Sequence, residues 1–547
     1  MLGVRTCSHP TGDPMSIDPT PLDLTADVVV AGGGPAGAWA ALTAARAGAD
    51  VLLLDKGYCG TSGPTASGGT GVWYVQPDPD QREQAMASRE ALGGHLADRR
   101  WAARVLDQTY ENMNRLGTEA RYPFPVVGGE PHKRGVQGPE YMRRMRSWIR
   151  RAGVRILDHS PVLELLTDAS GTVAGVRGHR RQHDTEYRVR AGAVVLATGG
   201  CAFLSGALGC DVDTGDGALY AAEAGAELSG MEFSNAYGIA PAFSSVTKTA
   251  YYNFATFFRA DGTRLEGAGS QGGRTVIARE LLRAGTVLCS IDQADPEQQA
   301  QMRLGQPNFF LPFDRLGIDP FTEKFPVTLL LEGTVRGTGG IRIAGDDCAT
   351  TVPGLYAAGD AATRELICGG FTGGGSHNSA WAMSSGTWAG RGAARFAASL
   401  GATRHRRRLV GAGADGPGAG VDGPDAADPA AAVEVIRAQV HPYDRNYLRH
   451  GDRLRPALAE LDRVWATLRG SAAARGAEAV RTRQAAAMVA HARWMYTSAL
   501  ARTESRGMAR REDFPALDPA QRRRLTVGGL DELWTRPEAA DRQAVAS

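Results

Sequence analysis

The sequence DVVVAGGGPAGAWAALTAARAGADVLLLD, residues 27–55, decides the fold. Its apolar start at 27–31 predicts a buried strand, residues 38–47 predict a helix, and residues 51–54 predict a second buried strand. A Gly-rich turn joins the first strand to the helix, so the stretch has the order of a βαβ unit. We therefore expect an α/β protein with a parallel sheet near its N-terminus.

The turn carries the G-x-G-x-x-G pattern at Gly32, Gly34 and Gly37. The first Gly allows a tight turn, the second lets the backbone approach a pyrophosphate, and the third lets the helix pack closely on the strand. The N-terminus of the helix offers free N–H groups and a positive dipole end to phosphate. Asp55 ends the second strand, where a carboxylate can accept from ribose hydroxyls. This context predicts a dinucleotide site.

Three later stretches favour FAD over NAD. A Ser/Thr/Gly run at 61–71 follows the second strand, and further strands end in Ala-Thr-Gly-Gly at 197–200 and in Ala-Gly-Asp at 358–360. Each stretch alone is consistent with a simple turn. Their order is that of a large flavin-binding domain, so we predict bound FAD.

The composition is that of an ordinary globular protein, with 43% hydrophobic and 22% charged residues among 547. The formal net charge of +2 argues against nucleic acid and against a polybasic membrane contact. No apolar run approaches the ~18–20 residues that a membrane helix needs. We expect a cytoplasmic protein without membrane insertion.

Seven Cys residues stand at irregular spacing, and no two form a C-x-x-C pair. The sequence therefore predicts no iron–sulfur or zinc framework and no other metal site. The odd number of thiols suits a reducing compartment. The oligomeric state stays open.

Changes in composition and pattern divide the chain. We expect a Rossmann-like FAD-binding domain that is interrupted by an α+β capping domain and followed by a helical C-terminal domain. The predicted parts are a disordered arm at 1–22, the first part of the FAD-binding domain at 23–226, the capping domain at 227–334, the second part of the FAD-binding domain at 335–400, a linker at 401–429 and the helical domain at 430–547.

Five ordered motifs resemble the flavoproteins of fumarate reductase, succinate dehydrogenase and L-aspartate oxidase. They are Thr-Gly-Asp-Gly with Met-Glu-Phe at 214–233, Asp-Gly-Thr-Arg at 261–264, Gly-Gly-Ile at 339–341, Pro-Gly-Leu-Tyr-Ala-Ala-Gly-Asp at 353–360, and Arg-Thr-Glu-Ser-Arg-Gly at 502–507. Together with the Gly-rich turn at 32–37 they span about 480 residues, which makes chance similarity a poor explanation. A short turn at 371–377 is similar to the adenylylsulfate reductase alpha subunit.

The resemblance implies a flavin-binding fold with a mobile cap. It also implies that the turn at 373–379, which opens a helix, faces the flavin C2 carbonyl, where a helix N-terminus stabilises negative charge. Together with the turn motifs it predicts these cofactor-binding residues: Gly32, Gly34, Pro35, Ala36, Gly37, Asp55, Lys56, Thr61, Ser62, Ser67, Gly68, Gly69, Val162, Ala197, Thr198, Gly199, Thr214, Asp216, Gly359, Asp360, Gly375, Ser376, Asn378 and Ser379.

The sequence departs from the family where flavin becomes covalently attached. Members that bind flavin covalently carry a His in a Ser-His-Thr turn, whereas Ser62 is followed here by Gly63 and Pro64. We therefore predict non-covalent FAD.

The substrate positions of the dicarboxylate enzymes also differ. By ungapped comparison, Tyr237 takes the place of a His, Tyr251 that of an Arg, and Thr372 that of a carboxylate-clamping Arg, while the stretch 335–340 lacks a His. A dicarboxylate clamp depends on guanidinium and imidazole donors. We expect a site remodelled away from fumarate and succinate.

Four residues are catalytic candidates, each with a plainer alternative. Tyr251 and Tyr237 are potential proton donors or acceptors, or else aromatic packing in the cap. Arg336 is an anionic anchor for the substrate, or else a surface Arg. His377 contacts flavin or substrate, or else has a structural role.

The expected function is FAD-dependent oxidation or reduction of a small organic substrate, with carbon–carbon desaturation or enoyl reduction fitting the resemblance best. Two alternatives stay open. One is an oxidase that returns electrons to dioxygen. The other is an electron-transfer flavoprotein subunit that works with an iron–sulfur partner protein, in the manner of adenylylsulfate reductase.

Overall fold

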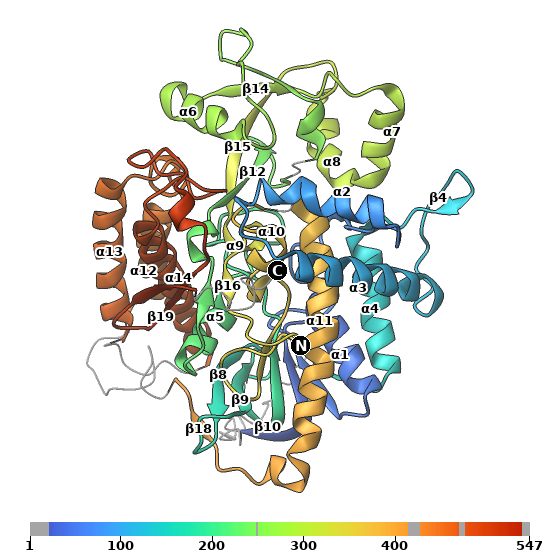
Figure 1. Cartoon of the computed structure of the whole chain (residues 1–547), viewed down its shortest axis with the longest axis vertical. Helices are drawn as coiled ribbons and strands as arrows, with labels where there is room; N and C mark the ends of the chain where they lie inside the picture. The colour runs from blue at the N-terminus through green and yellow to red at the C-terminus, as the bar shows by residue number, and fades with distance from the viewer. Residues whose placement is uncertain (1–20, 248–249, 373, 414–426, 470–475, 539–547) are drawn as a thin grey trace, which may run out of the picture.

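The computed structural model describes residues 21–247, 250–372, 374–413, 427–469 and 476–538 (Figure 1). An eight-stranded sheet lies at the centre, in the order β18-β8-β9-β10-β1-β2-β7, with β17 also paired to β10. The expected βαβ unit pairs β1 with β2 in parallel, from Val28 opposite Val51 to Ala31 opposite Leu54. The strands are β1 (Leu22–Ala31), β2 (Val51–Leu54), β7 (Arg155–Leu157), β8 (Val162–Thr167), β9 (Val173–Arg180), β10 (Thr185–Leu196), β17 (Leu355–Ala357) and β18 (Val410–Gly411).

Two helices cover the sheet next to the Gly-rich turn. Helix α1 (Pro35–Arg46) packs against the long helix α11 (Gly374–Ser399). The helices approach closely because α11 has Gly at the contacts: a Cβ on Gly386 would lie 2.3 Å from the Ala36 carbonyl oxygen, and one on Gly390 would lie 2.2 Å from that of Ala40. The small residues of α11 therefore serve helix packing.

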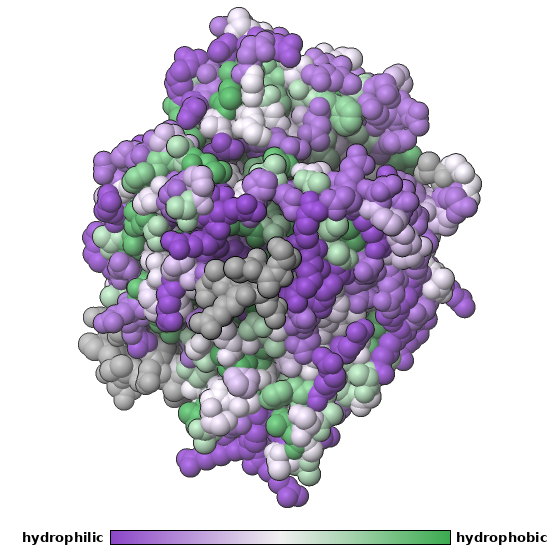
Figure 2. Space-filling model, in the orientation of Figure 1, coloured by the Kyte–Doolittle hydropathy of each residue, from purple (hydrophilic) through white to green (hydrophobic). Residues whose placement is uncertain are grey.

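Further elements complete this domain. Figure 2 shows hydrophilic side chains over the face that α2 and α3 form. Helix α2 accordingly buries no residue, whereas α3 buries one side. The elements are α2 (Pro79–Glu90), α3 (Arg99–Thr118), α4 (Gly138–Arg151), α5 (Asp216–Glu223), α9 (Gly333–Arg336), α10 (Glu365–Cys368), β3 (Gly69–Gly71), β4 (Val126–Val127), β5 (Glu130–Pro131) and β6 (Gly135–Gln137).

The cap lies above the central sheet in Figure 1 and has a four-stranded antiparallel sheet of its own, in the order β12-β15-β14-β13. A cluster of Phe and Tyr rings fills its core, with Phe313 packed edge-on to Phe325 at 4.7 Å between ring centres. Its elements are β12 (Ala236–Pro241), β13 (Thr256–Phe258), β14 (Val287–Ser290), β15 (Phe325–Glu332), α6 (Arg274–Ala284), α7 (Pro296–Gly305) and α8 (Pro307–Leu316).

Three helices dominate the C-terminal region, as the sequence predicts. They are α12 (Pro429–Val440), α13 (Gly451–Arg469) and α14 (Gly476–Ala501). Two strands that were not expected follow them, β19 (Leu525–Gly528) and β20 (Trp534–Pro537). Strand β19 pairs with β11 (Leu228–Ser229), which also pairs with β16 (Gly340–Ile341), so this sheet joins the chain end to the flavin domain.

Two local predictions need correction. The first part of the expected linker, 401–413, is ordered, since β18 pairs with β8 and Arg407 donates to the carbonyl oxygens of Ala191 and Gly192. The predicted arm overlaps the described residues only at 21–22, where β1 begins at Leu22, and the linker residues 414–426 lie outside them.

Within the described ranges, no helix combines the length and the apolar character that crossing a bilayer requires.

Candidate functional site

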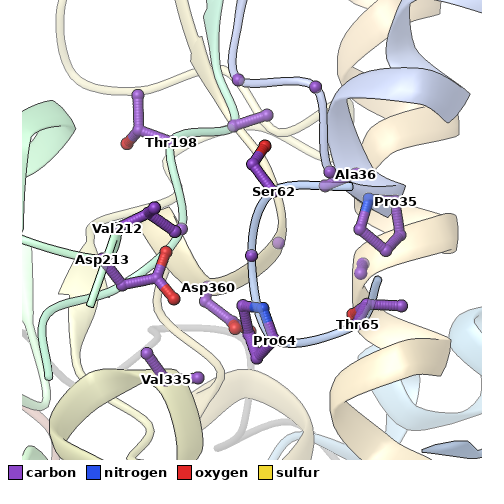
Figure 3. A pocket seen from close by; sticks show the side chains of 18 of the residues that line it. Pro35, Ala36, Ser62, Pro64, Thr65, Thr198, Val212, Asp213, Val335 and Asp360 are labelled. Carbon is purple, nitrogen blue, oxygen red and sulfur yellow. The ribbon is translucent and has the colours of Figure 1, made fainter. Parts of the chain in front are cut away.

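A cavity opens at the carboxyl ends of β1, β2 and β10, where Ala31, Leu54 and Ala197 form part of its wall (Figure 3). This edge is where parallel α/β sheets bind ligands. The predicted cofactor residues that line the cavity are Gly32, Gly34, Pro35, Ala36, Asp55, Lys56, Ser62, Gly69, Val162, Ala197, Thr198, Gly199, Asp216, Gly359, Asp360, Gly375, Asn378 and Ser379.

The Gly-rich turn has the shape that a dinucleotide needs. A Cβ on Gly32 would lie 2.1 Å from the Ala197 carbonyl oxygen, and one on Gly37 would lie 1.8 Å from that of Gly32. Both positions therefore serve close packing of strand, turn and helix. A Cβ on Gly34 would meet nothing within 4 Å, because this residue faces the cavity. Open backbone at the start of α1 suits a phosphate group.

Asp55 is held by three protein donors. Its Oδ2 accepts from the Gly33 amide at 2.7 Å, and its Oδ1 accepts from the Gly57 amide at 2.7 Å and from the Ser62 hydroxyl at 2.9 Å. The carboxylate therefore ties the turn after β2 to the turn after β1. Remaining lone pairs of the two oxygens can accept from a ligand.

Lys56 neutralises the acidic side of the cavity. Its Nζ donates to Asp216 Oδ2 at 2.7 Å and to Thr214 Oγ1 at 2.8 Å. Thr214 in turn donates to Asp216 Oδ1 at 2.8 Å. Lys56 and Asp216 line the cavity, and Thr214 stands behind them.

Buried polar atoms test whether the cavity fits a cofactor. The Thr198 hydroxyl oxygen, Asp213 Oδ2 and Asn378 Oδ1 belong to cavity-lining residues, and none has a hydrogen-bond partner among the described residues. Buried polar groups are rarely left unpaired in folded proteins. A ligand with both donors and acceptors satisfies them, so the residues fit FAD.

Several predicted cofactor residues lie outside the lining: Gly37, Thr61, Ser67, Gly68, Thr214 and Ser376. The Ser67 hydroxyl lies 3.2 Å from the Pro64 carbonyl oxygen, and the Gly68 carbonyl accepts from the Gly138 amide. The Ser376 carbonyl accepts from the Trp73 amide. These residues shape the loops around the cavity.

Arg336 lines the cavity, as its predicted role requires. Its Nε lies 3.4 Å from Glu332 Oε1, and its side chain is 23% exposed. Glu332 is buried and also accepts from the Thr247 hydroxyl at 2.6 Å. This pair holds a guanidinium at the boundary between the cap and the flavin domain.

The other three catalytic candidates are not among the lining residues. The Tyr237 hydroxyl donates to the Val440 carbonyl oxygen at 2.9 Å, and burial raises its pKa well above the ordinary value. The Tyr251 hydroxyl donates to the Met302 carbonyl oxygen at 2.8 Å. His377 is buried against Trp73, with 4.4 Å between ring centres.

Two functional candidates were missed from the sequence. Asp213 lines the cavity, and burial raises its pKa well above the ordinary value, with the charge of Asp360 adding to the effect. Arg274 is buried in the cap, where it donates to the Tyr237 carbonyl oxygen at 2.6 Å and where burial lowers its pKa. Neither belongs to a motif used above, so only the fold reveals their burial.

The described residues contain no group of three or more His, Cys, Asp and Glu side chains that could hold a metal ion. The six Cys residues of this part of the chain are buried thiols. Burial raises the pKa of Cys59 to about 12. Such a thiol is inert as a nucleophile.

Comparison with known proteins gives two family matches. A model described as an FAD binding domain matches residues 27–237, and one described as the fumarate reductase flavoprotein C-terminus matches residues 444–541. Among curated proteins, L-aspartate oxidase of Streptomyces coelicolor is 30% identical over 93% of this chain and 92% of its own length. The first match confirms the expected cofactor.

Solved structures share the fold over almost the whole chain. A mutant of Escherichia coli quinol fumarate reductase FrdA covers 95% of this chain and 97% of its own, with a TM-score of 0.79 and 21% identity. Adenylylsulfate reductase of Archaeoglobus fulgidus covers 95% and 96%, with a TM-score of 0.76 and 18% identity. The fold prediction, including the cap and the helical C-terminal region, is confirmed at this level.

Proposed function

The chain belongs to the flavoprotein family of fumarate reductase, succinate dehydrogenase and L-aspartate oxidase and is an FAD-dependent oxidoreductase, and from this starting point we propose that it oxidises or reduces a small organic substrate other than fumarate or succinate. The reaction class that fits the family best is carbon–carbon desaturation or its reverse, enoyl reduction. Bound FAD supplies the hydride acceptor or donor.

The observation that carries this proposal is how the residues at the family's substrate positions are engaged. The hydroxyls of Tyr237 and Tyr251 donate to backbone carbonyl groups, and the Thr372 hydroxyl oxygen accepts from the Gly374 amide at 3.2 Å. A dianion needs several guanidinium or imidazole donors at once. These three side chains provide no guanidinium or imidazole donor for a dianion.

Two cations line the cavity, Lys56 and Arg336, and we assign Arg336 to substrate binding. Arg336 stands in the cavity wall, with Glu332 behind it to fix its orientation. A single guanidinium suits a substrate with one anionic group. Arg274 lies close enough to Glu332 and Arg336 for their charges to affect its pKa, which burial lowers. Arg274 donates to the Tyr237 carbonyl oxygen and, like the two Tyr hydroxyls, is not among the lining residues of the cavity.

The test starts with the holoenzyme, photoreduced without oxygen and mixed with excess fumarate while the visible band of the flavin is followed. We expect the band to stay bleached. Rapid return of the band would contradict a remodelled site. A parallel sample receives dioxygen and must regain its colour, which shows that the flavin stayed active.

The identity to an L-aspartate oxidase favours one specific alternative, an oxidase that uses dioxygen. Anaerobic mixing of the oxidised holoenzyme with L-aspartate tests it directly. Bleaching by L-aspartate, followed by fast reoxidation in air, would establish that alternative. Slow reoxidation by air together with fast reoxidation by a ferredoxin-type protein would instead favour an electron-transfer subunit that works with an iron–sulfur partner.

We also propose that FAD is held without a covalent bond. The turn at Ser62, Gly63 and Pro64 forms one wall of the cavity, and the described lining contains neither His nor Cys. Tyr220 is the phenol in the wall, and its hydroxyl donates to the Val162 carbonyl oxygen at 2.7 Å. We expect acid denaturation to release all flavin into the supernatant, and flavin that stays with the precipitate would contradict this.

A further inference from the structure

Asp213 is a buried carboxyl group in the wall of the FAD cavity that none of the motifs includes. It is 4% exposed and lies between β10 and α5. Figure 3 shows its carboxyl group directed into the cavity, on the side where Asp360 and Pro64 lie. Its Oδ2 has no hydrogen-bond partner among the described residues. This oxygen is therefore placed to form a hydrogen bond with a ligand in the cavity.

The position of Asp213 is fixed by close packing. A Cβ on Gly199 would lie 2.1 Å from Asp213 Oδ1, so the carboxyl group rests directly on the turn after β10. The Ala202 amide donates to the Asp213 carbonyl oxygen at 2.8 Å, which anchors the backbone. The side chain has little room to turn away from the cavity.

The charged groups around Asp213 are engaged elsewhere. Lys56 is paired with Asp216, and Asp360 is paired with Arg364, whose guanidinium also donates to the Val335 carbonyl oxygen. Arg336, which also lines the cavity, is paired with Glu332. No salt bridge joins a cation to Asp213 within the described residues. The other titratable groups close enough to interact electrostatically with Asp213 are Asp55 and the thiols of Cys201 and Cys210.

This surrounding favours the neutral acid. Burial raises the pKa of Asp213 well above its ordinary value, and the negative charges of Asp360, Asp216 and Asp55 raise it further, while Lys56 opposes them. Burial raises the pKa of Asp360 as well, but Arg364 and Arg336 oppose that rise. When two carboxyl groups lie close together, the one without a cation partner keeps the proton.

We propose that Asp213 holds a proton at neutral pH and donates it in a hydrogen bond to an acceptor atom of bound FAD. Asp213 is then a cofactor-binding residue that acts as an O–H donor, as carboxylic acids kept neutral in apolar sites do. The inference requires FAD in the cavity and does not depend on which substrate the enzyme uses. Failure of the fumarate experiment would therefore leave it untouched.

The first test measures release of FAD from the holoenzyme on dilution, followed by flavin fluorescence. Asp213→Asn keeps a donor of the same shape, and we expect its dissociation constant within about twofold of the wild type. Asp213→Ala removes the donor and should weaken binding about tenfold. Asp211→Asn, an exposed change two residues away, is the matched control. An Asp213→Ala variant that retains FAD as the wild type does would overturn the proposal.

The second test detects the protonated carboxyl group directly and does not require the Ala variant to fold. Infrared difference spectra of the holoenzyme, taken on photoreduction, should contain the C=O stretch of a protonated carboxylic acid. We expect this band in the wild type and in Asp211→Asn, and its loss in Asp213→Asn. A wild type without the band, or an Asp213→Asn spectrum that keeps it, would show that Asp213 is not the protonated group.

Discussion

Lys56 is the cation that neutralises the buried acid Asp216 in the cavity wall. Their side chains are only 17% and 10% exposed, and Nζ lies 2.7 Å from Oδ2. Breaking a buried pair leaves the remaining charge uncompensated. In Lys56→Met the carboxylate of Asp216 would stay in the cavity wall without its cation, which disfavours binding of the anionic FAD. We expect the dissociation constant for FAD to rise about tenfold or more, measured by flavin fluorescence.

Lys324 offers a control for this change, since the chain has few Lys residues and this one lies in the cap. Its Nζ lies 3.3 Å from the Gly262 carbonyl oxygen, in an exposed contact. Lys324→Met should leave FAD binding unchanged. An equal loss of FAD affinity in Lys56→Met and Lys324→Met would mean that the effect of Lys56 does not arise in the cavity.

At the scale of the element, the turn between β1 and α1 contains one Gly that serves packing and another that faces the ligand cavity. A Cβ on Gly37 would lie 1.8 Å from the Gly32 carbonyl oxygen, whereas Gly34 has open space toward the cavity. We expect Gly34→Ala to fold with an unchanged thermal midpoint in the absence of FAD and to bind FAD at least about tenfold more weakly. Gly37→Ala should instead lower the thermal midpoint or yield insoluble protein.

Calorimetry and flavin content check this pair of variants together. The two changes add the same methyl group three residues apart, so each is the control of the other. A Gly34→Ala protein that retains FAD as the wild type does would mean that the cofactor phosphates do not approach this turn.

The elements also show which parts of the fold can be predicted from local sequence patterns. The βαβ unit at 27–55 was predictable because each part carries its own signal, and the observed strands and helix match it. Strand β19 was not predicted from the sequence, because besides its neighbour β20 it pairs with β11, almost 300 residues earlier in the chain. The roles of Asp213 and Arg274 could not be predicted from the sequence for a similar reason. Their burial depends on distant segments, and a single charged residue gives no periodic signal.

The side chains of the cap could be placed only after folding. Sequence comparison puts Tyr237 and Tyr251 at substrate positions, but it does not tell where their hydroxyls point. The structure directs one toward the end of α12 and the other toward α7. Direction is set by the packing of rings such as Phe309 and Tyr443 against them, which is a property of the assembled domains.

At the scale of the whole molecule, a buried ionic network joins the flavin domain to the C-terminal region. Arg502 contacts Glu232 at 2.7 Å and Glu504 at 2.9 Å, and all three side chains are at most 1% exposed. Glu365 of α10 lies beside this network and accepts from the Ser229 hydroxyl. Removing one partner from such a network costs stability, because a charge stays buried without compensation.

Glu365 should make the stability of this junction depend on pH. Burial, with the charge of Glu232 adding, raises its pKa from 4.5 to about 8, against the opposing charges of Arg524 and Arg502. The unfolded chain loses this proton near the ordinary pKa, whereas the folded protein keeps it until about pH 8. The contribution to stability is therefore complete below the ordinary pKa and is lost as pH rises through the folded value.

Glu365→Gln removes this dependence because Gln has no proton to lose, while its carbonyl oxygen can still accept from Ser229. Relative to the wild type, we expect the variant to gain about 2 kcal/mol in unfolding free energy between roughly pH 6 and 9, or a few degrees in thermal midpoint. Glu186→Gln, an exposed change on β10, is the control. Parallel pH profiles for the wild type and Glu365→Gln would mean that Glu365 is charged in the folded protein, and the buried network would then have to balance its charge.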